Sequence, residues 1–341
     1  MPKRFPILLF VLVAVMVVMS ACGEKSKEDV VEKLSQQAEE MPGYKTDVTM
    51  TMRTGKEEQK YQIQIWHKED NFYKVKLHNQ EDEKGNQVIL KNKSGVYVLT
   101  PALNKSFKFQ SDWPDNTSQP YLYASLVKDI KKDTDAEFSV TENHYVFKTK
   151  TNYQNNQTLP MQEIYFDKKT FKPVMVKVFN QDAQALVEVQ FDNFKKAEGL
   201  KKEDFDVDQN MAMASAEVPV SNMEEEGNSA NEVLYPNVTH GAELVDKREV
   251  QTDEGTRVIM TYQGDKSFTL IQESAEVQPT SAGQAVTVNA DPALAGGTVA
   301  AMSKQRMQWT ESGTTFNLAS EDLTREEMVS VASSINNHST K

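Results

Sequence analysis

The sequence has almost none of the residues that build disulfide frameworks and metal centres. Its 341 residues include one cysteine and five histidines. A single cysteine excludes an intrachain disulfide and every metal site that needs several thiolates. No two histidines show the spacing of metal ligands, and so few leave little material for a histidine-rich centre. We therefore expect no metal and no cofactor.

Catalytic motifs are also missing. The sequence contains no glycine-rich phosphate loop, no G-x-S-x-G elbow and no H-E-x-x-H zinc motif. No histidine neighbours a nucleophile motif, and each is more simply explained as a solvated or packed side chain. We therefore expect the protein not to be an enzyme.

Basic residues are the minority of the charged ones. Lysine and arginine number 38 against 50 aspartates and glutamates, which gives a formal net charge of −12. An acidic surface repels a phosphate backbone, so no nucleic-acid partner is expected. With 38% hydrophobic and 26% charged residues, the composition is that of a globular protein.

The only long apolar run lies at the start of the chain. Residues 1–4 include Lys3 and Arg4, and residues 5–19 carry no charge. The run is shorter than the roughly 20 residues of a membrane-spanning helix. A basic start, a short apolar core and small residues before a cleavage site are typical of a secretory signal peptide, here residues 1–21.

The single cysteine directly follows that segment. Met19-Ser20-Ala21-Cys22 resembles the lipobox of bacterial lipoproteins. The resemblance implies that Cys22 is diacylated and becomes the first residue of a lipidated N-terminus, residues 22–25. The N-terminal diacylglycerol would then anchor the protein to the extracytoplasmic face of the cell membrane, and two acyl chains suffice for stable anchoring. The alternative is an incidental cysteine beside an uncleaved anchor.

Residues 26–207 have the pattern of an α+β domain. Ser26 and Asp29 form a potential capping box, and apolar residues recur at helical spacing as far as Met41. From Tyr44 the apolar period becomes two, with short turns between the runs, which predicts a meander of antiparallel strands. One further helix is predicted over 120–131, and the strand pattern continues to Val207.

A change of composition separates the rest of the chain. Residues 208–228 are small, weakly patterned and then acidic, which favours a linker; the alternative is a long surface loop within one domain. Residues 229–341 predict a second, small antiparallel α+β domain. Its last helix begins at a capping box formed by Thr324 and Glu327, and 277–297 is rich in loop residues.

Two hairpin motifs resemble the outer-membrane lipoprotein carrier (LolA-like) superfamily. The first motif, residues 93–101, is a strand that ends at Pro101. The second, residues 163–174, is a strand, a turn at Asp167 and a return strand that begins with Pro173. The resemblance implies a curved antiparallel sheet, an open half-barrel wrapped on helices, with an apolar cavity for acyl chains. The whole layout resembles the sporulation-associated lipoproteins of Bacillus, and the C-terminal part resembles a small domain of extracytoplasmic Gram-positive proteins.

The alternating strands predict which side chains share the inner face of that sheet. The expected apolar cleft is formed by Met50, Met52, Tyr61, Ile63, Ile65, Tyr73, Val75, Tyr97 and Phe107. The alternative is an ordinary core that the two helices cover. Methionine adapts well to irregular ligands.

Two functions follow from these alternatives. The first is a membrane-anchored, non-enzymatic lipoprotein that binds an acyl chain, such as palmitate, or a lipoprotein in envelope or spore formation. The second is a protein-interaction scaffold or regulator of the spore cortex or envelope machinery, with a filled core and no ligand. The anchor, and a turn at 68–71 that is acidic where soluble carriers are basic, favour a tethered binder over a shuttle.

Overall fold

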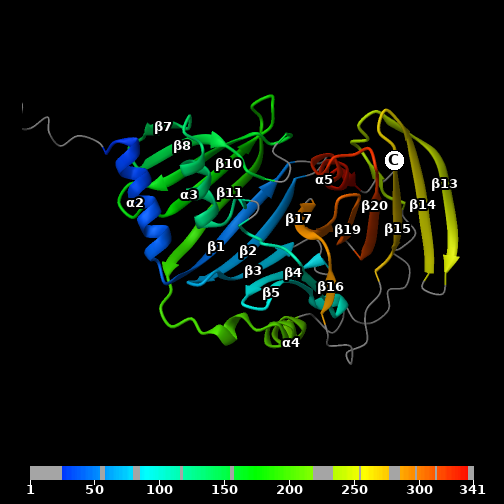
Figure 1. Cartoon of the computed structure of the whole chain (residues 1–341), viewed down its shortest axis with the longest axis horizontal. Helices are drawn as coiled ribbons and strands as arrows, with labels where there is room; N and C mark the ends of the chain where they lie inside the picture. The colour runs from blue at the N-terminus through cyan, green and yellow to red at the C-terminus, as the bar shows by residue number, and fades with distance from the viewer. Residues whose placement is uncertain are drawn as a thin grey trace, which may run out of the picture.

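A computed structural model describes residues 25–53, 58–79, 85–115, 118–153, 157–217, 233–252, 255–275, 285–295, 298–311 and 313–336. The fold is α+β, with two open sheets that are mostly antiparallel (Figure 1). The predicted signal peptide and Cys22 lie outside the described residues. Within the described ranges, no helix combines the length and the hydropathy needed to cross a bilayer.

The first described element is the predicted N-terminal helix, α2 (Lys27–Glu40). The backbone amide of Asp29 donates to Ser26 Oγ at 3.1 Å, and the amide of Ser26 donates to Asp29 Oδ2 at 3.2 Å. Two amides that the helix itself cannot satisfy are thereby paired. The helix ends before Pro42, as predicted.

The first sheet is open and mostly antiparallel. Its strands from this half are β1 (Gly43–Met52), β2 (Gln59–Lys68), β3 (Phe72–Asn79), β4 (Gln87–Asn92), β5 (Gly95–Thr100), β6 (Lys105–Phe109), β7 (Glu137–Val140), β8 (His144–Lys150), β9 (Met161–Asp167), β10 (Pro173–Phe179) and β11 (Ala185–Lys196). The order is β16-β6-β5-β4-β3-β2-β1-β11-β10-β9-β8-β7, so β1 pairs with β2 on one side and with β11 on the other.

Two helices cover one face of this sheet. α3 (Tyr123–Lys132) and α2 contact each other, and both present apolar side chains to the strands (Figure 1). Val30 and Leu34 of α2, and Leu126 and Ile130 of α3, belong to one buried cluster with the inner residues of the strands. This face therefore carries the main core.

The opposite face carries a smaller core. After β11 the chain forms the short 3₁₀ helix η3 (Lys202–Phe205) and then α4 (Val207–Glu217). Another 3₁₀ helix, η2 (Pro101–Leu103), lies earlier in the chain, after β5. Phe205 packs on Phe72 with ring centroids 5.5 Å apart, and Lys74 donates to the carbonyl of Asp204 at 3.0 Å. The predicted strand pattern to Val207 was wrong, because these contacts stabilise helical turns at the end of that segment.

The expected linker begins inside α4. Ala214 of that helix packs on outer residues of β4 and β5, and residues 218–232 lie outside the described residues. The division of the chain at 208–228 stays a prediction.

The second sheet comes from the C-terminal part of the chain. Its elements are β13 (Ala242–Thr252), β14 (Gly255–Gly264), β15 (Phe268–Ser274), β17 (Asp291–Ala295), β18 (Thr298–Met302), β19 (Arg306–Glu311) and β20 (Thr314–Ala319), in the order β13-β14-β15-β20-β19-β18-β17. The predicted last helix is α5 (Arg325–Ser333), and β12 (Tyr235–Pro236) pairs with β21 (Ile335–Asn336).

The two halves share hydrogen bonds. β16 (Val286–Val288) leaves the C-terminal half and joins the first sheet in parallel with β6. Gln87 of β4 donates to the carbonyl of Val299 at 3.3 Å and accepts from its amide at 2.6 Å, in a buried setting. Val299 also belongs to the main core of the first half. β16 lies within 277–297, the stretch that the sequence marks as rich in loop residues, and it extends the first sheet.

Candidate ligand-binding cavity

The space predicted as a cleft is filled. Most of the predicted residues lie together in the main core and are at most 5% exposed; they are Met50, Met52, Tyr61, Ile63, Ile65, Tyr73 and Val75. Phe107 is half-buried and packs against the same cluster. The side chains of α2 and α3 occupy the room between this face and the helices, so this region is a packed core.

Tyr97 is the exception. It belongs to the smaller cluster on the opposite face, beside Leu90 and Leu99 and near Ala214 of α4. Its neighbours Val96 and Val98 point to the main core instead. The inner-face prediction for Tyr97 was wrong because β5 is apolar on both faces, so its sequence does not distinguish them.

Aromatic rings tie α3 to this core. Tyr123 of α3 meets Tyr44 and Phe166 edge to face, with ring centroids 6.5 and 6.3 Å apart. Such edge contacts add to the stabilisation from buried area. They fix α3, and with it the loop that precedes the helix.

A cavity of about 430 Å³ lies at one end of the packed core, where the two halves meet. Its apolar wall from the first half is formed by Met50, Met52, Leu159, Val178, Leu186 and Val187. The second half contributes Val238, Leu294, Val329, Ser330 and Ser333. We call this space the junction cavity. Its volume lies within the roughly 300–1,000 Å³ of small-molecule sites.

The strand ends explain why the wall is apolar. Met50 and Met52 are the last inward residues of β1, and they pair with Val189 and Val187 of β11. β17 and α5 supply Leu294 and Val329 to the same hollow. Side chains that would otherwise be exposed to water thus face a hollow.

A buried polar network supports one side of the cavity. Ser118 Oγ donates to Asp129 Oδ1 at 2.5 Å, and Gln162 Nε2 donates to Asp129 Oδ2 at 2.8 Å. The Tyr153 hydroxyl donates to Gln162 Oε1 at 2.5 Å. Burial raises the pKa of the Asp129 carboxyl group above its ordinary value, and the two hydrogen bonds offset only part of that effect. Ser118 and Tyr153 line the cavity, so the network holds both loops in place.

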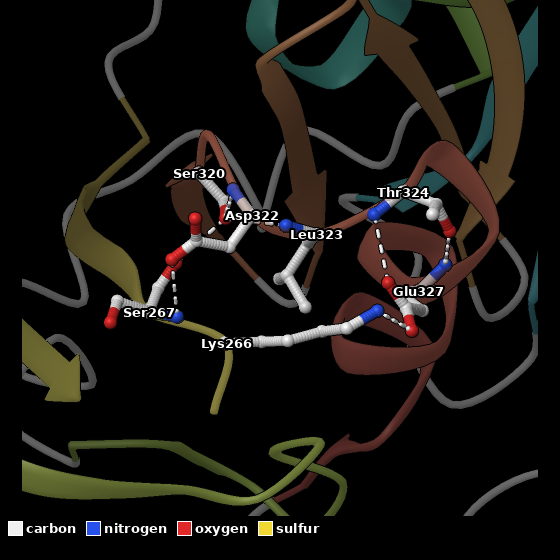
Figure 2. A network of polar contacts seen from close by, with 7 residues as sticks. All are labelled: Lys266, Ser267, Ser320, Asp322, Leu323, Thr324 and Glu327. Atoms are coloured by element: carbon white, nitrogen blue, oxygen red, sulfur yellow. Dashed lines mark hydrogen bonds and ion pairs between the residues drawn. The ribbon is translucent and has the colours of Figure 1, made fainter. Parts of the chain in front are cut away.

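A second network fixes α5 on the other side (Figure 2). The Thr324 and Glu327 capping box predicted from the sequence is confirmed, with the amide of Thr324 donating to Glu327 Oε2 at 2.8 Å. The ammonium of Lys266 pairs with the same carboxylate. Ser267 donates through its amide to Asp322 at 2.9 Å, which binds the β14–β15 turn to the start of the helix.

The contacts of Glu327 with Lys266 and Thr324 stabilise the fold to an extent that depends on pH, because they depend on the charge of the Glu327 carboxylate. Burial raises the pKa of Glu327, but the hydrogen bonds from Lys266 and the Thr324 amide lower it more, so the pKa lies below its ordinary value. A carboxylate with a lowered pKa stabilises the folded state at neutral pH, and this contribution is lost as the pH falls through the folded-state pKa.

Lys266→Met is therefore expected to lower the free energy of unfolding by about 1 kcal/mol at pH 7. The difference from the parent protein should vanish in acid, once Glu327 is protonated in both. Urea unfolding at several pH values measures this. Lys304→Met, at an exposed lysine, is the control with no expected effect. An equal loss for Lys266→Met at neutral and acid pH would contradict the assignment.

Comparison with known proteins identifies the family. The sequence model of a family described as "Sporulation protein YdcC-like" matches residues 2–205. "Sporulation protein YdcC" of Bacillus subtilis (strain 168) is 45% identical over 339 residues, which cover 99% of this chain and 98% of that protein. The chain belongs to the YdcC-like sporulation protein family. The resemblance to sporulation-associated Bacillus proteins is thus confirmed.

Solved structures with a similar arrangement are distant in sequence. The complex of Pseudomonas aeruginosa MucA and MucB contains a chain that matches 92% of this protein over 100% of its own length, at 14% identity and a TM-score of 0.34. The LolA superfamily protein NE2245 of Nitrosomonas europaea matches 55% of this chain over 100% of its own length, at 11% identity and a TM-score of 0.30.

Sequence reasoning found Met50 and Met52 of the cavity wall and missed the others. Val178, Leu186 and Val187 lie in the strands β10 and β11, and Leu294 and Val329 belong to the other half of the chain. The sequence signal that could have indicated these wall residues was the presence of apolar side chains at the ends of the strands. Nothing in the local pattern indicates that residues so far apart in sequence face one hollow.

Proposed function

We propose that this family member is a non-enzymatic envelope lipoprotein of spore formation that holds an acyl chain in the junction cavity. The observation that carries the proposal is the cavity itself. The hollow has a volume of about 430 Å³ and a wall rich in aliphatic and methionine side chains, which is the kind of lining that small-molecule sites have.

The sequence supports the placement in the envelope. The signal-peptide pattern of residues 1–21 and the lipobox ending at Cys22 favour an extracytoplasmic protein tethered by diacylglycerol. Membership of a sporulation family favours a role in spore or envelope formation. An acyl-bearing lipoprotein or an envelope lipid would be the partner.

The second candidate is an interaction scaffold without a ligand. It is favoured by the packed core under α2 and α3, where the sequence had placed the cleft. In that case the junction cavity holds only water and the partner is a protein of the spore cortex or envelope machinery.

Filling the cavity separates the two. Leu186 lines the hollow, and Leu186→Trp is expected to weaken binding of 1-monolauroylglycerol at least about tenfold, since the indole takes the space of the ligand and each tenfold corresponds to about 1.4 kcal/mol. Titration calorimetry below the micellar concentration measures it. Native mass spectrometry of the purified parent protein should also show co-purified lipid.

Val245→Trp is the matched control, because Val245 is 53% exposed on the edge strand β13. It should bind the probe like the parent. If the parent protein binds neither the probe nor any co-purified lipid, the acyl-binding function is wrong and the scaffold remains.

A further inference from the structure

The wall of the junction cavity carries very little charge. Among its described lining residues there is no lysine, arginine or histidine, and Asp182 is the one charged side chain. The other polar side chains are hydroxyls and amides, from Ser118, Gln119, Tyr153, Thr158, Asn180, Gln181, Ser330 and Ser333. An anionic head entering this site would meet no cation and would have a carboxylate beside it.

A second carboxylate lies behind the wall. Asp129 is 2% exposed and receives the hydrogen bond of Ser118, which itself lines the cavity. Lys128 and Lys132 of α3 lower the pKa of the Asp129 carboxyl group by their charge. Their ammonium groups also donate to the carbonyl of Asp115 at 2.6 Å and to Asn152 Oδ1 at 3.0 Å. Both lysines are exposed and neither lines the cavity. A ligand with negative charge therefore meets the carboxylate of Asp182 and no cation in the described wall of the cavity.

Gln119 offers a neutral group in the same place. Its side chain is 9% exposed and lines the cavity. Among the described residues its side-chain amide makes no hydrogen bond. A buried amide gains from a ligand that donates or accepts a hydrogen bond, and a carbonyl or hydroxyl provides it without the cost of burying a charge.

We infer that the junction cavity selects acyl chains with an electrically neutral head, namely an acyl ester, an amide or an acylglycerol, over free fatty acids and phosphate-bearing lipids. Gln119 is the residue that receives the head, and Asp182 is the residue that repels an anion. The inference rests on the proposed function, because it concerns the head group of the acyl chain that the cavity holds.

The test uses two ligands with the same chain. Laurate and 1-monolauroylglycerol are titrated into the full chain at pH 8, where laurate is ionised, by calorimetry below their micellar concentrations. We expect 1-monolauroylglycerol to bind at least about tenfold more tightly than laurate. Equal binding, or tighter binding of laurate, would overturn the inference while leaving acyl binding in place. Binding of neither ligand would remove the proposed function and this inference with it.

Two variants assign the effect to named residues. Asp182→Lys should raise the affinity for laurate at least about fivefold and leave 1-monolauroylglycerol unchanged. Glu243→Lys makes the same change of charge at an exposed residue of the edge strand β13 that does not line the cavity. It should change neither affinity, and an equal gain with Glu243→Lys would show that only net charge acts.

Gln119→Leu keeps the size of the side chain and removes the amide. It should weaken 1-monolauroylglycerol about fivefold, as expected for one neutral hydrogen bond, with little effect on laurate. An unchanged affinity for 1-monolauroylglycerol would overturn the role of Gln119. A thermal melt of each variant shows that it is folded under the conditions of the titration.

Discussion

Ile65→Ala is expected to lower the free energy of unfolding by about 2–5 kcal/mol. Ile65 is fully buried and lies in the middle of β2, where it pairs with Thr46 of β1 and Val75 of β3. It belongs to the same cluster as Leu34 of α2. Because neighbours fill the space on every side, the truncation loses buried area and also leaves a cavity that the surroundings relax into only in part.

Equilibrium unfolding in urea measures this loss, with the slope of the transition compared between the proteins. Val250→Ala is the control, since Val250 is 43% exposed on β13 and surface truncations change stability by less than about 0.5 kcal/mol. A loss for Ile65→Ala as small as that of the control would mean that the space under α2 and α3 is unfilled, as the first cleft hypothesis required.

Cys22→Ala is expected to release the protein from the membrane almost completely or to block its maturation. The proposed anchor is the pair of acyl chains on the cysteine, each buried CH₂ being worth about 0.8 kcal/mol. A mature chain with a formal negative charge gains nothing from anionic lipid head groups.

Fractionation of producing cells, together with labelled palmitate, measures the loss. Lys25→Ala changes an exposed residue next to the lipobox and leaves the cysteine in place, so it should stay with the membrane and keep the label. If Cys22→Ala still sediments with the membrane and is cleaved at the same bond, the lipobox interpretation is wrong.

Local sequence signals predicted the elements of the fold well. Ser26 and Thr324 mark two helix starts because their side chains pair with amides that the helix leaves free, and this chemistry lies within four residues. The strands β1 and β2 followed from strict alternation, since each has one buried face and one more exposed face. These features are local, so the sequence alone carries them.

Features that depend on distant partners were not predictable in the same way. α4 is only weakly amphipathic and forms where Met211 and Ala214 meet the outer face of β4 and β5. Tyr97 took the opposite face because both faces of β5 are apolar. The junction cavity needs Met52 and Val329 to face one hollow, and no pattern in either segment specifies the other. Tertiary contacts decided each of these outcomes.

The hydrogen bonds between Gln87 and Val299 join positions 212 residues apart. Loop-closure entropy opposes such a pairing until much of the intervening chain is ordered, and contacts of large sequence separation slow folding. The strand β6 of the first sheet likewise lacks its outer partner until β16 pairs with it. For a chain that emerges N-terminus first, the first sheet is thus completed only when the last third of the protein has been delivered. The order of synthesis and the order of assembly therefore differ, and β6 presents an unpaired edge during the interval.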